Sequence, residues 1–295
     1  MVHARLILAL ALSAATLALT GCAGDAHRAD EAQNTDTVAV AETLVSSPYL
    51  LSLEEVEAAT NSPEYALIDL RKAEAFATGH IPGAVSVWRP DIQNLELEYG
   101  GMMAPKEKIE KLFGRLGIST GTKVIIYDEK GLVDAARLWW ILQYYGYSEA
   151  YMFDGGLTAW KDSGRELSTG IVEAESAEFV LAGPQRPEIY ASRTMVEAAV
   201  SGDGTVLLDT RSEIEFSGGE MKSGAFRAGH IPGALWIDYC KAIEYNGNQH
   251  FLPQAEIEEL YAAAGLQKDT PIIVYCHSGV RSAHTTFVLR ELLGY

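Results

Sequence analysis

The chain contains little cysteine, little positive charge and no apolar run long enough for a comfortable membrane span. Three cysteines in 295 residues do not make a disulfide framework. Acidic residues outnumber basic ones by 40 to 23, and the net charge of −17 argues against nucleic acid or an anionic membrane surface as a partner. The apolar stretch 6–19 is too short for a comfortable transmembrane helix. His, Cys and carboxylate side chains do not cluster at ligand spacing, so we expect neither a metal nor a cofactor.

The N-terminal segment has the features of an export signal. After a short basic start, the apolar stretch runs into Leu19-Thr20-Gly21-Cys22, which resembles a bacterial lipobox. We predict a signal peptide over 1–21, lipidation of Cys22, and anchoring in the bacterial cell envelope. Ala23, in place of Asp, favours the outer membrane, facing the periplasm. A plain signal peptide with a chance cysteine is the alternative. Residues 22–46 lack periodicity and are predicted to form a disordered tether.

The rest of the chain is an internal repeat. The pattern Gly-His-Ile-Pro-Gly-Ala occurs at 79–84 and again at 229–234, each time after an Asp-x-Arg tripeptide. Further pairs recur at a constant offset of 148 residues: Pro105 and Pro253, Gly117 and Gly265, Tyr127 and Tyr275, Gly131 and Gly279. So long a period indicates two duplicated domains rather than a solenoid. We predict domains over 47–168 and 188–295, joined by a linker over 169–187.

Strand and helix patterns alternate within each copy. Short apolar runs predict buried strands at 65–68, 124–127, 150–153, 206–208 and 272–275. Amphipathic spacing predicts helices at 106–116, 157–161, 255–264 and 283–293. This alternation is typical of an α/β fold, in which each copy is a parallel sheet flanked by helices.

A single cysteine stands where chemistry is expected. Cys276 lies between a predicted strand and a predicted helix, where N–H groups and the helix dipole lower a thiol pKa. Arg281 adds a fixed cation, so the turn suits attack on an anionic substrate. At the same offset the first copy has Asp128, and it must therefore be structural or supply substrate contacts. Cys240 is expected to be a small half-buried side chain, with a regulatory disulfide to Cys276 as the minor alternative.

The repeat combined with one cysteine turn resembles the tandem-domain rhodaneses, the thiosulfate and 3-mercaptopyruvate sulfurtransferases. The resemblance covers about 47–295 and includes 135–140 and 153–160, which are similar to the family's non-catalytic domain. It implies two rhodanese-like domains and a ping-pong reaction. The Cys276 thiolate would attack the outer sulfur of a small anionic donor. The resulting persulfide would then pass its sulfur to a thiophilic acceptor.

The resemblance also implies roles for other residues. The loop residues that would surround the persulfide and the donor are His277, Ser278, Gly279, Val280, Arg281 and Ser282. Arg281 would hold the donor's oxyanion end, or would instead pair with an acid and stiffen the loop. Arg137 would reach into the cleft from the first domain, or would instead form an interdomain ion pair. Asp209 and Arg211 are expected to form a supporting ion pair under the loop.

The histidines are expected to be structural. His80 and His230 occur in both copies, so catalysis cannot explain them, and we expect both to stabilise their turns by hydrogen bonds. His277 is expected to point outward, since the loop uses its backbone. His284 falls one turn into the helix and has no clear role.

Two features depart from the family pattern. Thiosulfate enzymes resemble Cys-Arg-Lys-Gly-Val-Thr and mercaptopyruvate enzymes Cys-Gly-Ser-Gly-Val-Thr, whereas this loop, from Cys276 to Arg281, reads Cys-His-Ser-Gly-Val-Arg. We expect an anionic donor, with thiosulfate ranked first and 3-mercaptopyruvate as the alternative, and an acceptor such as cyanide or a thiol. In addition, the strand and helix that follow Tyr147 have no counterpart after Tyr295. We expect a fragment of a chain longer by about 20 residues. If Tyr295 is instead the true end, we expect a destabilised catalytic domain with weak activity.

Other functions compete with sulfur transfer. Cysteine phosphatases and arsenate reductases place five residues between cysteine and arginine, but only four separate Cys276 from Arg281, and the tighter ring suits a sulfur atom better. A non-enzymatic envelope lipoprotein that binds a partner or carries sulfur is the second alternative. The sequence leaves the acceptor and the oligomeric state open.

Overall fold

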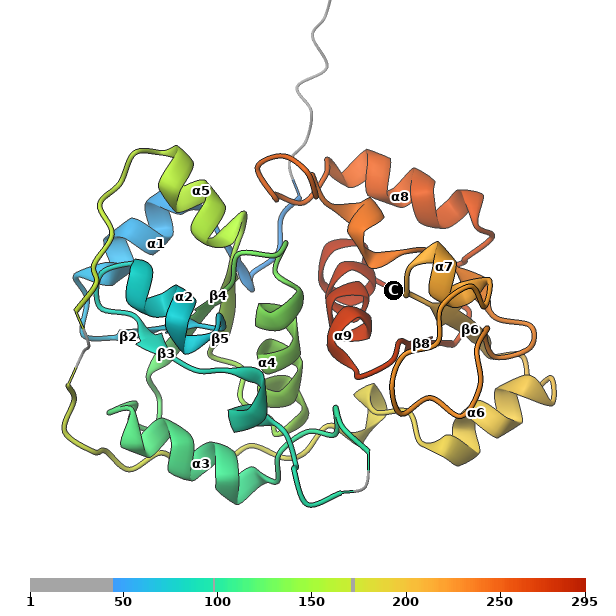
Figure 1. Ribbon diagram of the computed structural model, residues 1–295, viewed down its shortest axis with the longest axis horizontal. Helices are drawn as coiled ribbons and strands as arrows, with labels where there is room; N and C mark the ends of the chain where they lie inside the picture. The colour runs from blue at the N-terminus through green and yellow to red at the C-terminus, as the bar shows by residue number, and fades with distance from the viewer. Residues whose placement is uncertain (1–44, 98, 171–172) are drawn as a thin grey trace, which may run out of the picture. The chain divides into compact units, whose positions relative to one another are not determined.

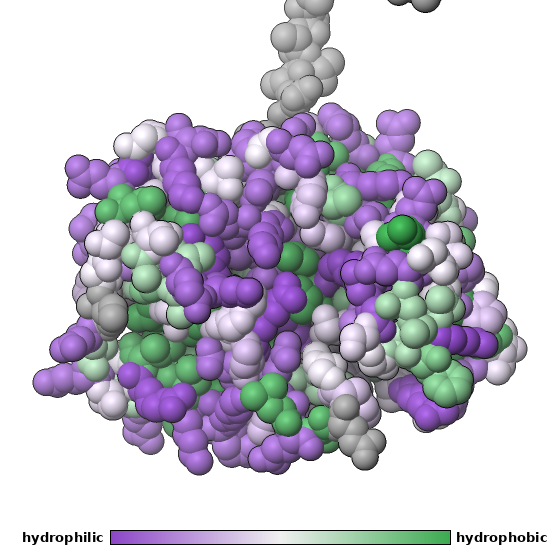
Figure 2. Space-filling model, in the orientation of Figure 1, coloured by the Kyte–Doolittle hydropathy of each residue, from purple (hydrophilic) through white to green (hydrophobic). Residues whose placement is uncertain are grey.

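The computed structural model describes residues 45–97, 99–170 and 173–295, which all belong to one compact unit. The predicted signal peptide, Cys22 and nearly all of the predicted tether lie outside the described residues. In the part that the structure describes, no helix combines the length and the apolar character needed to cross a membrane. On the face in Figure 2, hydrophilic residues predominate and hydrophobic ones form small scattered groups.

The first copy is built on a five-stranded parallel sheet in the order β1-β5-β4-β2-β3. Its strands are β1 (Leu50–Leu51), β2 (Tyr65–Asp69), β3 (Val85–Ser86), β4 (Lys123–Tyr127) and β5 (Ala150–Phe153). Its helices are α1 (Leu53–Thr60), α2 (Ala73–Thr78), α3 (Lys106–Arg115), α4 (Val133–Tyr144) and α5 (Gly156–Asp162). Successive residues of β4 supply two separate cores: Ile125 packs with α1, α2 and α5, and Ile126 with α3 and α4. Burial on both faces explains why these strands are continuous apolar runs.

The second copy has a three-stranded parallel sheet in the order β7-β6-β8. Its strands are β6 (Val206–Asp209), β7 (Leu235–Trp236) and β8 (Ile272–Tyr275). Its helices are α6 (Arg193–Val200), α7 (Glu213–Phe216), α8 (Gln254–Ala263) and α9 (Val280–Phe287), and α9 continues into a π-helical turn at Val288–Leu292. These elements confirm the predicted α/β class and, to within a few residues, the predicted strands and helices.

The open edge of β8 distinguishes the two sheets. Within the described chain β8 pairs with β6 alone, whereas β4 of the first copy has β2 on one side and β5 on the other. Val124 and Ile126 are fully buried, but their counterparts Ile272 and Val274 are only half-buried. The described second copy therefore lacks the strand that covers this edge in the first.

Helices α4 and α9 face each other at the junction of the two copies (Figure 1). The ring of Phe287 packs edge-on against Trp139, with centroids 4.9 Å apart at 88°. Both side chains belong to one core cluster that extends through α4, α8 and α9. Because α9 starts at the cysteine turn, this packing brings the turn next to the first copy.

Two turn devices are repeated in both copies. Arg71 binds the Asp69 carboxylate and the carbonyl of Gly79, and Arg211 binds Asp209 and Gly229 in the same way. His80 stacks on Phe76 and hydrogen-bonds its carbonyl at 3.0 Å, while His230 does the same with Phe216 at 2.8 Å. Since the copy without a cysteine has all of these contacts, they hold the shared scaffold.

The connection between the copies runs along the first one. Residues 173–186, within the predicted linker, form neither helix nor strand. Phe179 and Leu181 are buried against the first copy, and the N–H of Ala177 donates to the carbonyl of Gly114 at 2.9 Å. The segment is therefore packed rather than free.

Candidate active site

Cys276 lies at the turn between β8 and α9, and its side chain is half-buried. Its sulfur is 3.6 Å from the hydroxyl oxygen of Ser282. Burial alone would raise the pKa of the Cys276 thiol. The N–H and hydroxyl of Ser282, the N–H of Ser278 and the charge of Arg281 outweigh burial and hold the pKa below its ordinary value. The turn therefore favours the thiolate.

The first copy shows what its version of this turn binds. The Asp128 carboxylate, at the position of Cys276, accepts four backbone N–H bonds of 2.7–3.0 Å, from Lys130, Leu132, Asp134 and Ala135. Burial and Asp134 raise the pKa of Asp128 to about 6, while these N–H donors oppose the rise. At neutral pH the turn thus encloses an anion with converging amides. The residues at the matching positions of the second copy are Ser278, Val280, Ser282 and Ala283.

The N-terminus of α9 lies closer to the cysteine than the sequence predicts. The predicted helix begins at 283, but α9 begins at Val280, with Gly279 as its N-cap at φ +77. Arg281 and Ser282 are therefore helical, and the helix dipole acts close to the sulfur. The positive φ of Gly279 favours glycine, and a Cβ atom there would lie 2.8 Å from the Arg137 guanidinium and displace it.

Arg137 reaches the turn from α4 of the first copy. Its guanidinium donates to the carbonyl of Gly279 at 3.3 Å and to that of Gly101 at 2.8 Å, and it lies 5.0 Å from the centre of the Trp140 ring. Burial lowers the pKa of Arg137 to about 10, so it remains a cation at neutral pH. Within the described chain its hydrogen-bond partners are carbonyls rather than an acid, which disfavours the interdomain ion pair that was the alternative to a role in the cleft.

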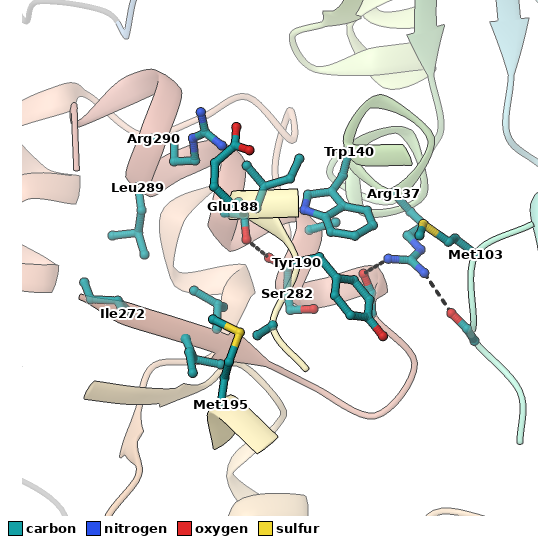
Figure 3. Close-up of a pocket in the computed structure, with 18 of the residues that line it drawn as sticks. Met103, Arg137, Trp140, Glu188, Tyr190, Met195, Ile272, Ser282, Leu289 and Arg290 are labelled. Atoms are coloured by element: carbon teal, nitrogen blue, oxygen red, sulfur yellow. Dashed lines mark hydrogen bonds between the residues drawn. The ribbon is translucent and has the colours of Figure 1, made fainter. Parts of the chain in front are cut away.

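A cavity of about 550 Å³ borders the cysteine turn (Figure 3). At one end it is lined by Arg137, Ser278, Gly279 and Ser282. The other end runs along Ile272–Val274, the edge that β5 covers in the first copy, so its shape there reflects the open sheet. The cation and the cysteine turn lie at the same end of the cavity.

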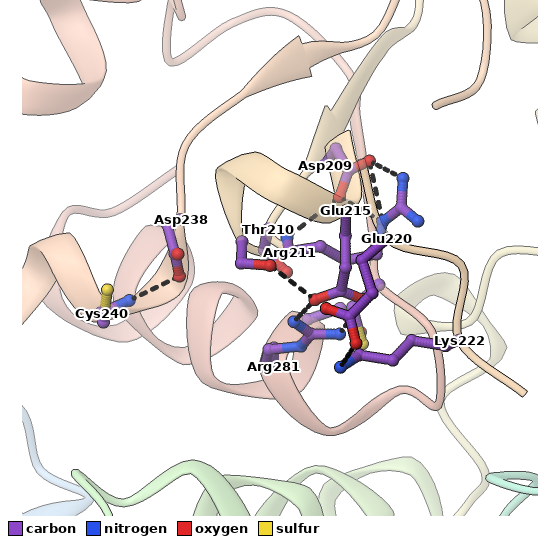
Figure 4. A network of polar contacts seen from close by, with 12 residues as sticks. Asp209, Thr210, Arg211, Glu215, Glu220, Lys222, Asp238, Cys240 and Arg281 are labelled. Atoms are coloured by element: carbon purple, nitrogen blue, oxygen red, sulfur yellow. Dashed lines mark hydrogen bonds and ion pairs between the residues drawn. The ribbon is translucent and has the colours of Figure 1, made fainter. Parts of the chain in front are cut away.

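Arg281 is paired with a buried acid. Its guanidinium makes two bonds to the Glu215 carboxylate, at 2.5 and 3.0 Å (Figure 4), and neither Arg281 nor Cys276 is among the residues that line the cavity. This is the acid pairing that the sequence left open as the alternative to donor binding. The same pairing leaves Arg281 unavailable to close a ring around a tetrahedral phosphate or arsenate.

The structure also shows the contacts of Asp209, Arg211, His277 and Cys240, which the sequence singled out. Asp209 and Arg211 form their ion pair at the end of β6, with Nη2 2.6 Å from Oδ2. His277 is exposed and its Nε2 lies 3.2 Å from the carbonyl oxygen of Ser223. Cys240 is half-buried, and burial, together with Asp238, raises the pKa of its free thiol to about 11. No group of three His, Cys, Asp or Glu side chains able to hold a metal is found in the described ranges.

Sequence reasoning missed Glu215 and the segment around Gly101. A Cβ atom on Gly101 would lie 2.7 Å from Ser278, so this segment of the first copy abuts the cysteine turn. Nothing in its sequence pattern indicates this contact. For Glu215 a signal existed, because both charges of the pair are absent from the first copy. Ala75 follows Asp69 by six residues, as Glu215 follows Asp209, and Val133 precedes Arg281 by the common offset of 148.

The fold and this turn together define a two-domain rhodanese. A model of the rhodanese-like domain matches residues 52–163 and 192–295, and the chain belongs to this family. The predicted family and the predicted duplication are thereby confirmed.

Individual relatives point to sulfurtransferases. The "Putative thiosulfate sulfurtransferase" of Mycolicibacterium smegmatis is 33% identical over 85% of this chain and 91% of its own. The sulfur carrier protein TtuD of Thermus thermophilus is 36% identical over 75% of this chain and 79% of its own. Among solved structures, the 3-mercaptopyruvate sulfurtransferase SseA of Escherichia coli matches with a TM-score of 0.73 at 27% identity, covering 82% of this chain and 93% of SseA. Tum1 of Saccharomyces cerevisiae, at 17% identity and a TM-score of 0.71, shows the fold alone.

Proposed function

We propose that the protein transfers a sulfane sulfur from an anionic donor, thiosulfate, to a thiophile through a persulfide on Cys276. The Cys276 thiolate attacks the outer sulfur of thiosulfate and forms a new S–S bond. The donor's own S–S bond breaks, and its electron pair leaves with sulfite. A thiophile such as cyanide then takes the outer sulfur as thiocyanate and regenerates the thiolate, so charge and atoms balance at each step.

The observation that carries this proposal is the anion held by the matching turn of the first copy. Four amides converge on the Asp128 carboxylate. The outer sulfur of a cysteine persulfide is three bonds from Cα, as the carboxylate oxygens of aspartate are. The turn of the second copy has backbone amides at the matching positions. In place of the fixed Asp128 carboxylate it would hold the anion of the Cys276 persulfide, which forms and is consumed in each cycle. Such preorganised donors stabilise the charge on the persulfide without solvent reorganisation.

Arg137 is proposed to bind the donor. It is a buried cation on the cavity wall, beside the turn, and an anionic donor would complement its charge. The sulfonate end of thiosulfate or the carboxylate of 3-mercaptopyruvate would suit it. The likeness to SseA favours 3-mercaptopyruvate as the second candidate donor, with pyruvate as the product.

A thiosulfate:cyanide assay tests the proposal. We expect sulfite and thiocyanate to form in equal amounts, and Cys276→Ala to abolish both. Cys240→Ala, at the other half-buried thiol, is the matched control and should retain activity. Wild-type rates no higher than those of Cys276→Ala, with both donors, would refute the enzymatic proposal. Pyruvate release from 3-mercaptopyruvate, measured in parallel, ranks the two donors.

The name of the Thermus relative supports a sulfur carrier as the alternative function. A carrier would accept one sulfur on Cys276 and hold it until a specific acceptor arrives. Mass spectrometry after incubation with thiosulfate separates the two. A stoichiometric gain of one sulfur without cyanide-dependent turnover favours the carrier.

Export and lipid anchoring through Cys22 are proposed on the N-terminal sequence alone. Fractionation of a bacterial host that expresses the full chain tests this. We expect the wild type in the outer-membrane fraction and Cys22→Ala in a soluble fraction. Equal soluble distribution of both would refute the lipid anchor.

A further inference from the structure

We propose that Glu215 is a positioning residue for the cysteine turn: it fixes Arg281 as a cation behind the turn, where the charge acts on the Cys276 sulfur rather than on the donor. This rests on the proposed function for its biological meaning. Its test uses the chemistry of the thiol alone and needs no sulfur transfer.

The hydrogen bonds of Glu215 fix the position of the Arg281 guanidinium. Both Glu215 oxygens receive an Nη of Arg281, and Oε2 also accepts the hydroxyl of Ser212 at 2.9 Å. The Glu215 side chain is 2% exposed and that of Arg281 21%. Two parallel bonds to a planar fork fix the direction of the guanidinium as well as its distance. Arg281 is in the first turn of α9, so holding it also holds the start of the helix that caps the cysteine.

The Glu215–Arg281 pair is not part of the scaffold that the two copies share. Asp209–Arg211 and His230–Phe216 recur in the first copy, which has no cysteine. Glu215 and Arg281 do not: their matching positions hold Ala75 and Val133. A rhodanese-like domain thus folds without the pair, and the pair accompanies the thiol.

The position of Arg281 determines how strongly its charge stabilises the Cys276 thiolate. Arg137 comes from α4, lines the cavity and binds the Gly279 carbonyl, whereas Arg281 comes from α9 and is bound to Glu215. Asp238, before the 3₁₀ turn Tyr239–Ala242, and Glu215, on α7, are the carboxylates whose charges act on Arg281. A guanidinium released from Glu215 would move toward water, and its stabilisation of the thiolate would fall with distance.

The test is the pH dependence of alkylation at Cys276. Wild type, Glu215→Gln and Glu215→Asp are treated with iodoacetamide over pH 5–10, and the Cys276 peptide is quantified by mass spectrometry. Glutamine keeps the shape of Glu215 but turns an N–H₂ donor toward one Nη, so it cannot make both bonds. We expect Glu215→Gln to raise the alkylation midpoint by about one pH unit, a tenfold smaller thiolate fraction below it. Glu215→Asp should recover part of the shift.

Two control variants test whether the shift in the alkylation midpoint is specific to the Glu215–Arg281 pair. Glu213→Gln, an exposed residue of the same short helix, should leave the midpoint unchanged. The double variant Glu215→Ala/Arg281→Val carries the residues of the first copy, so it should fold, and its midpoint gives the full effect of losing the cation.

The direction of the shift decides the proposal. If Glu215 only neutralised Arg281, Glu215→Gln would lower the midpoint, and the proposal would be overturned. An unchanged midpoint with only a lower melting temperature would overturn it in favour of a purely structural pair. A raised midpoint supports positioning whether or not the wild type transfers sulfur, so the two proposals fail independently.

Discussion

Replacing Arg137 by methionine removes the cation of the cavity while keeping much of its apolar stem. In the structure the guanidinium joins the carbonyls of Gly101 and Gly279 and stacks on Trp140. A hydrogen bond to a charged partner is worth about 1.5–3 kcal/mol. Losing one such bond to the donor would lower kcat/KM for thiosulfate by about ten- to a hundredfold.

The assay separates binding from support of the fold. Steady-state thiosulfate:cyanide kinetics of Arg137→Met should show the loss mainly in KM for thiosulfate, with a smaller effect on cyanide. Arg137→Lys, which keeps the charge but not the planar fork, should lie in between. The matched control is Arg165→Met, because Arg165 also stacks on a tryptophan of the first copy, Trp160, and is not among the cavity-lining residues. If Arg137→Met lowered stability but left KM unchanged, Arg137 would only tie the copies together.

Three further results are expected. Burial lowers the pKa of His284 to about 3, so the free energy of unfolding should fall as the pH drops below 6.5. In urea titrations the fall between pH 7 and pH 5 should be about 2 kcal/mol larger in the wild type than in His284→Leu. Equal falls in the two proteins would contradict this. Iodoacetamide at pH 7 should modify Cys276 well before Cys240, as peptide mapping would show; prior labelling of Cys240 would contradict the opposite pKa shifts. Phe287→Ala should destabilise the protein by about 3–5 kcal/mol in urea titrations, since its fully buried ring packs on Trp139; a loss below about 1 kcal/mol would mean that the contact is dispensable.

Much of the fold could be predicted because its signals are local and duplicated. The strands at Lys123–Tyr127 and Ile272–Tyr275 could be predicted because each contains a short apolar run, and the two runs recur at the same offset as the turns that follow them. The position of the cysteine followed from the same comparison. The start of α9 was missed because Gly279, a residue that usually ends helices, here begins one through its left-handed backbone angle.

The residues of the site could be predicted from the sequence better than the contacts between them. Arg137 was expected at the cleft, but its carbonyl partners depend on a turn at Gly101 that has no pattern in the sequence. The choice between donor binding and acid pairing for Arg281 could not be made without knowing that Glu215 is buried beneath it. Long-range side-chain partners such as these depend on tertiary packing, which periodicity does not encode.

The carboxylate of Asp128 has a consequence for how the two turns respond to solutes. Because it is covalently attached, it competes at an effective concentration that no free anion can match. Added sulfite or thiosulfate should therefore leave the amide environment at Lys130 and Leu132 unchanged. The matching turn holds the Cys276 thiolate instead, and in the proposed reaction this anion gains and loses a sulfur. At neutral pH one molecule thus contains one turn with a fixed anion and one turn whose anion changes, and the first serves as an internal reference for the second.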